Sequence, residues 1–374
     1  MLIYMSLSIG IVGLPNVGKS TLFNALTKKS VPAENYPFCT IDPSVGIVAV
    51  PDERLQQLSE FSQSKETIPA VVEFVDIAGL VEGASAGEGL GNKFLATIRE
   101  VDAILHMVRI FDIEDTSSTE QTHVYGSIDP LRDIKVINME LILADMETVQ
   151  SRIEKLVRDV KRGDKAAVAE TAVAQKVLKA LESEQLANSV ILSDDEKDIT
   201  KMWHLLTMKP ILFGFNKKTG GNNLDVTQPE QFAAIVSEVT ASGSQYVVLD
   251  AKTEHELSAF DTEEKVMMKE EIEHTDDGVD ELIVRSYQLL GLMTYFTTGE
   301  EETRAWTVTL GSTAPEAGKA IHTDFQQKFI RADIIKTTDL LSSGSFATAR
   351  SKGLLKTEGK EYVVKDGDVI EFRI

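Results

Sequence analysis

The feature that most constrains this 374-residue chain is a short glycine-bearing segment, Gly13–Ser20, placed directly after an apolar run. Its pattern is G-x-x-x-x-G-K-S, and its surroundings predict a strand over Ile9–Val12 and a helix over Lys19–Thr27. The two glycines let the backbone turn so that successive N–H groups point at phosphate oxygens, and the helix adds its positive dipole end. The sequence therefore predicts a phosphate-binding loop in an α/β nucleotide-binding domain.

Several residues in and directly after this loop have expected roles. The ammonium of Lys19 reaches the β- and γ-phosphates and serves catalysis, and the hydroxyl of Ser20 coordinates Mg²⁺. The other nucleotide contacts expected in this region come from Asn16, Val17, Gly18 and Thr21. A nucleoside triphosphate and Mg²⁺ are therefore the expected substrate and cofactor.

Two later segments are expected to sense the γ-phosphate. Thr40 lies in a proline-rich segment after the first helix and is expected to be a second Mg²⁺ ligand. Asp76 ends an apolar strand, 70–76, and is expected to hold Mg²⁺ through water, while the N–H of Gly79 reaches the γ-phosphate. Loss of that phosphate would release both loops. Ras-like enzymes use a glutamine after this glycine to orient water, but here the residue is Leu80, so another group must do so or hydrolysis is very slow.

The segment expected to read the base is Asn216-Lys217-Lys218-Thr219, which follows a predicted strand over 210–215. Guanine-specific members of this class use Asn-Lys-x-Asp, whose carboxylate accepts two hydrogen bonds from guanine. Asn216 and Lys217 fit that pattern, but Thr219 cannot accept both bonds. Because a missing polar partner lowers selectivity strongly, the sequence itself argues against GTP specificity.

The chain changes character after about residue 130. Apolar residues recur three and four positions apart from Met139 to Val160, a heptad stripe that breaks at Arg162-Gly163-Asp164 and is followed by a second helical stretch. This pattern predicts an antiparallel helical hairpin. Its tip is either a solvated surface or a contact for RNA or another polyanion. The basic residues at the tip are Arg158, Lys161, Arg162 and Lys165.

Sheet character returns at 210–215 and 245–249, so the α/β domain is interrupted by the hairpin and resumed after it. A third, α+β unit follows, with a strand over Ala305–Leu310 and a hairpin over Glu361–Ile374 that turns at Lys365–Asp368. The expected division is a nucleotide-binding domain over 1–130 and 206–278, a helical insertion over 131–205, and a last domain over 279–374.

Bulk properties exclude several classes of function. The net charge of −21 argues against non-specific nucleic-acid binding over the whole surface. No stretch approaches the roughly 20 apolar residues of a membrane span, and the single Cys39 excludes an internal disulfide and suits a reducing compartment. We therefore expect a cytoplasmic protein with no membrane or specific DNA partner. We also expect a monomer, although none of these bulk properties bears on the oligomeric state.

Several motifs together resemble the Obg-like ATPase family, also called YchF, over essentially the whole chain. They are Gly13–Ser20, 35–41 (Asn-Tyr-Pro-Phe-Cys-Thr-Ile), 76–91, 295–299 (Tyr-Phe-Thr-Thr-Gly), 304–306 (Arg-Ala-Trp) and 317–325 (Ala-Gly-Lys-Ala-Ile-His-Thr-Asp-Phe). The resemblance implies a Ras-like P-loop domain, an inserted helical coiled-coil hairpin and a C-terminal TGS domain of ubiquitin-like β-grasp form. It also implies an ATPase that associates with ribosomes or ribosomal RNA.

The same resemblance implies a catalytic histidine. The family places a hydrophobic residue where Ras has glutamine, which Leu80 matches, and a histidine in a mobile loop is thought to serve catalysis instead. The matching position here is His123, in Thr122-His123-Val124.

Two positions depart from the family pattern. The family has Asn-x-x-Glu where this chain has Thr219, and Ser or Cys before an alanine where this chain has Asp250 before Ala251. ATP remains the expected substrate over GTP because no carboxylate awaits guanine, while adenine can be read by backbone groups. The alternatives are a GTPase of the translation-factor class and a nucleotide-gated RNA or ribosome adaptor with negligible hydrolysis. Ribosome contact would depend on the hairpin tip and on a second basic cluster, Arg350, Lys352, Lys356 and Lys360.

Overall fold

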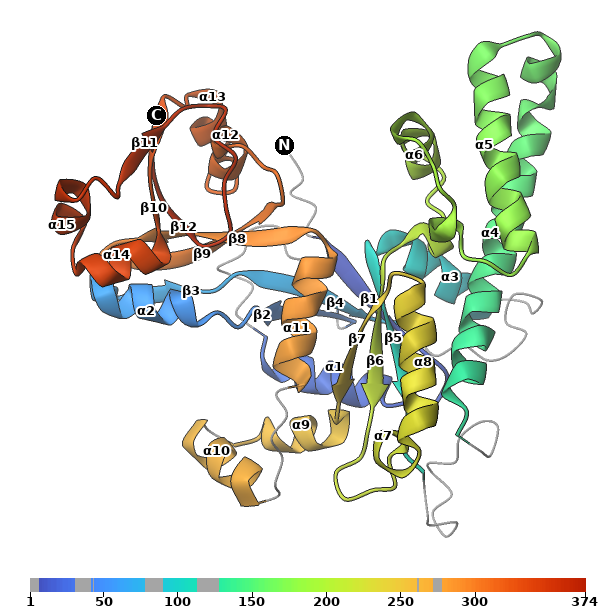
Figure 1. Cartoon of the computed structure of the whole chain (residues 1–374), viewed down its shortest axis with the longest axis horizontal. Helices are drawn as coiled ribbons and strands as arrows, with labels where there is room; N and C mark the ends of the chain where they lie inside the picture. The colour runs from blue at the N-terminus through green and yellow to red at the C-terminus, as the bar shows by residue number, and fades with distance from the viewer. Residues whose placement is uncertain are drawn as a thin grey trace.

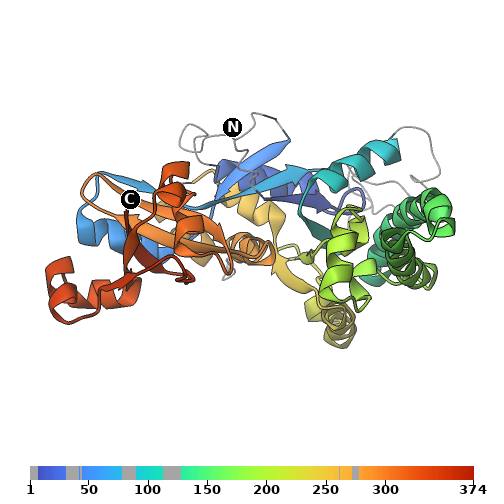
Figure 2. The ribbon, with the colours of Figure 1, turned by 90° about the horizontal axis from the view of Figure 1, so that it is seen from above.

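The computed structural model of the chain describes residues 7–30, 42, 44–77, 90–112, 128–260, 262–271 and 278–374. A central sheet, sheet A, lies between a projecting pair of long helices at one end of the molecule and a second sheet, sheet B, at the other (Figures 1 and 2). The molecule is thus mixed α/β, with the two sheets and the helical projection as its main parts.

Sheet A contains six strands, parallel except for the antiparallel pairing of its first two. Their order across the sheet is β2 (Val45–Ala49), β4 (Val71–Asp76), β1 (Ser8–Val12), β5 (Ala103–Arg109), β6 (Ile211–Asn216) and β7 (Gln245–Leu249). Every residue of β1, β5 and β6 is buried, as expected for parallel strands covered by helices on both faces. The strands predicted from the sequence for this sheet are all present.

Helices follow these strands, as the alternating sequence pattern predicts. They are α1 (Lys19–Lys28), α2 (Glu53–Ser62), α3 (Leu90–Glu100), α7 (Leu224–Thr227), α8 (Pro229–Ala241), α9 (Ala251–Leu257), α10 (Thr262–Glu271) and α11 (Gly278–Leu289). α11 packs against β6 and β7 of sheet A and also against β8 (Leu292–Thr298), the strand of sheet B that follows it in the chain. It therefore links the two sheets both in sequence and in space (Figure 1).

The predicted hairpin is confirmed as α4 (Pro130–Lys161) and α5 (Lys165–Glu182), which pack against each other and project from the molecule (Figure 1). Gly163 takes a positive φ of 78° at the turn, and the Asp164 side chain accepts the Ala167 N–H to begin α5. The pair shares an apolar cluster of its own with η2 (Ala187–Ser189), α6 (Asp194–Lys201) and η3 (Leu206–Met208), the short segments that lead back to sheet A.

A buried carboxylate fixes the base of this hairpin. Asp145, on α4, is fully buried and accepts hydrogen bonds from the Leu206 N–H, the Thr207 N–H and the Thr207 hydroxyl, at 2.9, 2.8 and 2.6 Å. Since all three donors lie in η3, this contact holds α4 against the return segment.

Sheet B has the strand order of a β-grasp. Its strands, in order, are β11 (Lys356–Glu358), β10 (Arg331–Lys336), β12 (Asp368–Arg373), β8 (Leu292–Thr298), β9 (Glu302–Thr309) and β3 (Glu66–Ile68). β8 and β12, the first and last strands of this part of the chain, lie parallel at the centre. The helices on this sheet are α12 (Ala314–Gly318), α13 (Thr323–Gln327), α14 (Thr337–Ser343) and α15 (Phe346–Ser351).

The predicted hairpin over Glu361–Ile374 is wrong. Only β12 forms there, and its partners are β10 and β8 rather than the preceding segment. That segment makes a single bridge from Val363 to Thr313. The side chains of Asp366 and Asp368 accept the backbone N–H groups of Thr294 and Lys365, so the turn delivers the chain into the sheet centre instead of folding it back.

The two sheets are joined by contacts that the sequence did not suggest. β3, from the first hundred residues, lies parallel to β9 as the edge strand of sheet B. From α2, Arg54 binds Asp52 and the Asp366 carboxylate at 2.7 Å and lies over the Phe296 ring. One hydrophobic cluster runs from sheet A through α11 to Phe296 and Val369 of sheet B. The nucleotide-binding and C-terminal parts are therefore packed as one body.

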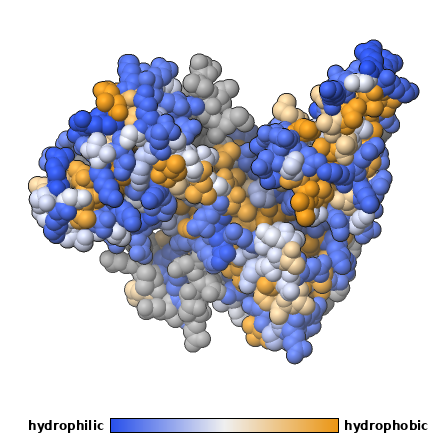
Figure 3. Space-filling view, turned by 45° about the horizontal axis from the view of Figure 1, so that its top comes forward, coloured by the Kyte–Doolittle hydropathy of each residue, from blue (hydrophilic) through white to orange (hydrophobic). Residues whose placement is uncertain are grey.

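The surface is hydrophilic over most of the face drawn in Figure 3, including the tip of the hairpin, with apolar patches on the hairpin and beside the notch between it and sheet B. Exposed apolar side chains on the hairpin include Leu143, Val157 and Val168. Among the described helices, none combines the length and apolar character needed to span a membrane.

Candidate functional site

The candidate site lies at the carboxyl edge of sheet A, where the ends of parallel strands meet and where such sheets bind ligands. Gly13–Ser20 connects β1 to α1 at this edge. Ile11 of β1 pairs with Asp76 at the end of β4, so that carboxylate comes beside the loop. The structure thus brings the predicted phosphate loop and one predicted Mg²⁺ ligand together.

Both glycines of the loop are required by close packing and by backbone conformation. Gly13 has a φ of 151°, and a side chain there would meet the Met107 carbonyl oxygen of β5 at 2.5 Å. Gly18 has a φ of 99° and lies so close to the Asn216 amide that a side chain would collide with it. Gly18 also begins α1 without a side-chain cap, which leaves the first N–H groups of that helix available to an anion.

The Lys19 ammonium is folded back onto the loop. Its Nζ donates to the Gly13 and Leu14 carbonyl oxygens at 2.9 and 2.7 Å, and the residue is only 8% exposed. Burial lowers the pKa of Lys19 from 10.5 to about 8, although the nearby Asp76 carboxylate acts in the opposite direction. Burial likewise raises the pKa of Asp76, against the attraction of Lys19. The cation is thus held in a partly desolvated cradle, where an arriving phosphate would relieve an existing penalty.

A buried histidine lies under the same loop. His106 of β5 is 1% exposed, and its ring centroid lies 5.1 Å from that of Phe213, with the two rings tilted by 30°. Burial, followed by the positive charge of Lys19, lowers the pKa of His106 to about 3, so the ring is neutral at physiological pH. It packs the strand and carries no charge that would compete with Lys19 for phosphate.

Asn216 ties the base-side loop to the phosphate loop. Its Nδ2 donates to the Val17 carbonyl oxygen at 2.9 Å, and its Oδ1 accepts the Ala251 N–H at 3.0 Å. The residue is buried at the end of β6, between the phosphate loop and the start of α9. The predicted residues Asn16, Val17, Gly18, Lys19, Ser20, Asp76 and Asn216 thus gather at one edge, and Thr21 follows in the first turn of α1. The predicted residues Thr40, Gly79 and His123, with Leu80, lie outside the described residues.

Comparison with known proteins gives close relatives along the whole chain. A relative named "Ribosome-binding ATPase YchF" from Bacillus subtilis is 51% identical over 369 residues, 99% of each chain, and one of the same name from Haemophilus influenzae is 46% identical over 371 residues. The chain belongs to the YchF family.

Structural and domain comparisons agree with that membership. The solved structure of the Schizosaccharomyces pombe YchF GTPase superposes with a TM-score of 0.86 at 37% identity, covering 98% of each chain. A family model described as a 50S ribosome-binding GTPase matches residues 8–143. The YchF-GTPase C-terminal model, described as a protein of unknown function, matches residues 292–374. The fold class predicted from sequence, a P-loop domain with a YchF C-terminal domain, is confirmed.

The donor atoms in this YchF-family site fit Mg²⁺. The Ser20 hydroxyl is on the exposed side of α1, and the Asp76 carboxylate is half-buried beside Lys19; both are oxygen donors, which Mg²⁺ prefers. Within the described ranges no group of three or more acidic, histidine or cysteine side chains gathers as a metal cage. One hydroxyl and one carboxylate suit an ion that takes its remaining ligands from phosphates and water.

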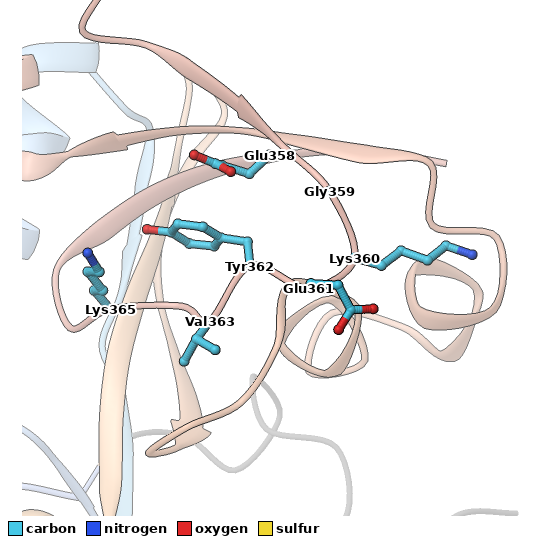
Figure 4. A pocket seen from close by; sticks show the side chains of 7 residues that line it. All are labelled: Glu358, Gly359, Lys360, Glu361, Tyr362, Val363 and Lys365. Atoms are coloured by element: carbon cyan, nitrogen blue, oxygen red, sulfur yellow. The ribbon is translucent and has the colours of Figure 1, made fainter.

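A shallow hollow of about 530 Å³ lies elsewhere, in the C-terminal domain of this YchF-family chain, within residues 358–365 (Figure 4). Tyr362 reaches across it and donates to Asp368 at 2.8 Å, while Lys360 and Glu361 point away from the hollow. Its lining mixes acidic and basic side chains and offers no concentrated charge. The phosphate loop, rather than this hollow, is the candidate functional site.

Sequence reasoning missed the role of Asp250, which caps α9 and contacts Thr219. An acidic residue just before a helix is a readable capping signal, but the contact with Thr219 depends on the neighbouring positions of β6 and β7.

Proposed function

We propose that this chain is a Mg²⁺-dependent ATPase that acts as a nucleotide-controlled switch on ribosomes. The observation that carries the proposal is the preformed phosphate cradle, in which Lys19 already lies buried between two loop carbonyls. The names of the full-length relatives, ribosome-binding ATPases, support both the reaction and the partner.

In the proposed reaction the loop N–H groups and Lys19 bind the β- and γ-phosphates. Ser20 and Thr40 would be the direct protein ligands of Mg²⁺, and Asp76 would hold the ion through water. Mg²⁺ would neutralise charge on the phosphate oxygens. The Gly79 N–H and Thr40 report the presence of the γ-phosphate, and its loss releases their loops. Because Leu80 cannot hydrogen-bond water, His123 is assigned the positioning of the attacking water.

The decisive assay is phosphate release from ATP by the purified protein, with and without ribosomes. We expect slow turnover that falls below detection in Lys19→Ala and is unchanged in Lys28→Ala, a control at an exposed lysine that ends α1. His123→Ala should lower turnover and leave ATP affinity nearly intact, whereas His322→Ala, at an exposed histidine of the C-terminal domain, should change neither. No hydrolysis under any condition would replace the ATPase by a nucleotide-gated adaptor.

GTP is the competing substrate, and specific observations favour it. The Schizosaccharomyces pombe relative is titled a GTPase, and Asn216 with Lys217 fits the guanine-reading pattern. The absence of a carboxylate at Thr219 favours ATP instead. Calorimetric titration with each nucleotide separates the two, since tighter GTP binding would reject the ATP assignment.

The proposed ribosome contact uses basic surfaces that are local to an acidic protein. Lys161 and Arg162 at the hairpin tip are exposed, and a charge-reversing double variant there should reduce co-sedimentation with ribosomes. Lys179→Glu, on the same hairpin but far from the tip, is the matched control. The second basic cluster, also exposed, comprises Arg350, Lys352, Lys356 and Lys360. Co-sedimentation that ignores whether ATP or ADP is bound would contradict the switch.

We further propose the division into 1–130, 131–205, 206–278 and 279–374, and a monomeric, cytoplasmic protein. The separate apolar cluster of α4 and α5 supports the boundaries of the insertion. Light scattering coupled to gel filtration would test the monomer directly.

A further inference from the structure

The carboxylate that is missing from the base-reading segment is present one loop away. Thr219 occupies the position of the guanine-reading carboxylate, while Asp250 follows β7, the strand next to β6. Asn216 and Leu249 pair in register at the ends of these strands, so the two loops leave the sheet side by side. The rim of the site on the base side is therefore built from both loops.

Both oxygens of the Asp250 carboxylate accept hydrogen bonds from the protein itself. Oδ1 accepts the N–H groups of Lys252 and Thr253, both at 3.0 Å, at the start of α9. Oδ2 accepts the Thr219 N–H at 2.6 Å and the Thr253 hydroxyl at 2.8 Å. The residue is 2% exposed. Four donors from two loops thus converge on one buried carboxylate, which is a clamp rather than a group free to read a base.

The clamp is connected to the phosphate loop. Ala251, the next residue, donates its N–H to Asn216, whose amide reaches the Val17 carbonyl oxygen. A shift of Asp250 would therefore move Thr219, the start of α9 and Asn216 together. The hydrogen-bond network thus makes Asp250 a positioning residue for the base-side rim.

The charge of Asp250 is retained at neutral pH. Burial by itself raises the pKa of this carboxyl, but the hydrogen bonds from Thr253 and Thr219 outweigh burial and hold the pKa below its usual value. The Thr219 hydroxyl lies 3.3 Å from the Thr253 hydroxyl, which in turn donates to Asp250. A carboxylate at position 219 would consequently stand one hydroxyl away from a fixed negative charge.

We propose that Asp250 determines base specificity by exclusion: it positions Thr219 and prevents a guanine-reading carboxylate from acting at that position. Repulsion between two carboxylates separated by one hydroxyl favours the protonated form of the new one, and a protonated carboxyl cannot accept the two hydrogen bonds that guanine offers. The inference rests on the proposed nucleotide site and deepens its preference for adenine. It makes Thr219 and Asp250 a coupled pair in this chain.

The test is a double-mutant cycle of Thr219→Asp and Asp250→Ser, read by calorimetric affinity for GTP, ATP and tripolyphosphate with Mg²⁺. Thr219→Asp alone should raise GTP affinity less than about threefold. Adding Asp250→Ser should raise it by at least about tenfold more, because the new carboxylate can then ionise. Asp250→Ser alone should weaken ATP by about tenfold, since the Thr219 loop is released, and weaken tripolyphosphate much less.

Matched variants isolate charge from shape. Thr219→Asn introduces the neutral isostere of aspartate and should give no coupling with Asp250→Ser. Asp195→Ser, at an exposed position on α6, should leave every affinity unchanged. If thermal melting shows that the serine variant has lost its fold, Asp250→Asn, which keeps an acceptor for the helix cap, takes its place in the cycle.

The outcomes are distinct from those of the ATPase assay. A Thr219→Asp protein that gains GTP affinity as strongly as the double variant would overturn the exclusion, whatever nucleotide the natural chain prefers. A natural chain that hydrolyses nothing, or that binds GTP more tightly than ATP, would reject the proposed function, yet the cycle would still report whether the two positions are coupled.

Discussion

Replacing Lys19 with methionine should show that this side chain promotes nucleotide binding but lowers the free energy of unfolding of the nucleotide-free protein. The Lys19 side chain is buried, and its pKa falls from 10.5 to about 8. At about 1.4 kcal/mol per pH unit, this corresponds to about 3 kcal/mol of destabilisation at neutral pH. The two hydrogen bonds to Gly13 and Leu14 offset about 1 kcal/mol each. We expect Lys19→Met, similar in volume and uncharged, to stabilise the nucleotide-free protein by about 1 kcal/mol.

The stability gained by Lys19→Met should decrease as the pH rises. Because the folded-state pKa of Lys19 lies below the unfolded value, the unfolded chain binds more protons between about pH 8 and 10.5. The natural protein therefore gains stability as pH rises through that window, whereas the Lys19→Met protein lacks this contribution. The advantage of the variant is complete below about pH 8 and disappears near pH 9. Towards pH 10.5 the natural protein should be the more stable of the two by about 2 kcal/mol.

Urea denaturation of both proteins at about pH 7 and about pH 9.5 measures this difference. MgATP should raise the denaturation midpoint of the natural protein much more than that of the variant, because a ligand stabilises the folded state in proportion to its affinity. Lys28→Met, at an exposed position of α1, controls for the loss of a lysine. A Lys19→Met protein that is less stable than the natural one at pH 7, by a margin that does not change with pH, would refute the reasoning.

Three further outcomes are expected. The affinity for MgATP should fall towards about tenfold per pH unit above about pH 8, as Lys19 loses its proton, when followed by calorimetry across that range. Arg54→Ala should lower the free energy of unfolding by about 1–2 kcal/mol in urea, since it removes the ion pair with Asp366 and the ring contact across the two sheets. Asp145→Ala should lower it by about 3 kcal/mol, because the Thr207 and neighbouring donors lose their buried acceptor.

Each of these has a control that the chain itself supplies. In Lys19→Ala the remaining ATP affinity should not vary with pH, and a parallel decline would assign the titration to another group. Arg285→Ala, which removes only an exposed pair within α11, should change stability by less than about 0.5 kcal/mol. An Asp145→Ala protein as stable as Asp198→Ala, a variant at an exposed carboxylate, would contradict the anchoring of the hairpin.

The parts of the fold that could be predicted are those determined by residues close together in the sequence. The phosphate loop needs two glycines because Gly13 and Gly18 adopt positive φ and pack against other backbone or side chains, and no other residue type serves both needs. The hairpin could be predicted because apolar spacing and a glycine turn at Gly163 act within one segment. β6 and β7 could be predicted from short apolar runs in a recurring α/β order.

The parts that could not be predicted depend on partners far along the chain. β3 is only three residues long and contains Glu66 and Thr67, so no apolar alternation marks it; its pairing with β9 stabilises it. The hairpin predicted over Glu361–Ile374 is wrong because a local turn signal was present but distant strands provide the pairing. Its turn residues are real, but β12 finds better partners in β10 and β8. For the candidate site, Lys19 and Asn216 could be placed from their motifs, while the use of Asp250 required knowing which loop lies beside it.

β3 also provides a route by which a structural change at the nucleotide site of sheet A could reach sheet B. β3 and β4 are separated only by Pro69 and Ala70, so one extended run of chain begins in sheet B and ends at Asp76 beside the phosphate loop. β4 is paired on both sides and β3 is paired with β9, and extended backbone does not lengthen or shorten easily. A displacement at Asp76 must therefore be taken up by sliding or tilting of the strand. Arg54 and the shared apolar cluster oppose independent movement of the two sheets. Coupling between nucleotide state and the C-terminal domain should therefore take the form of a small rigid-body adjustment of sheet B, carried by β3, and not of separation of the two domains.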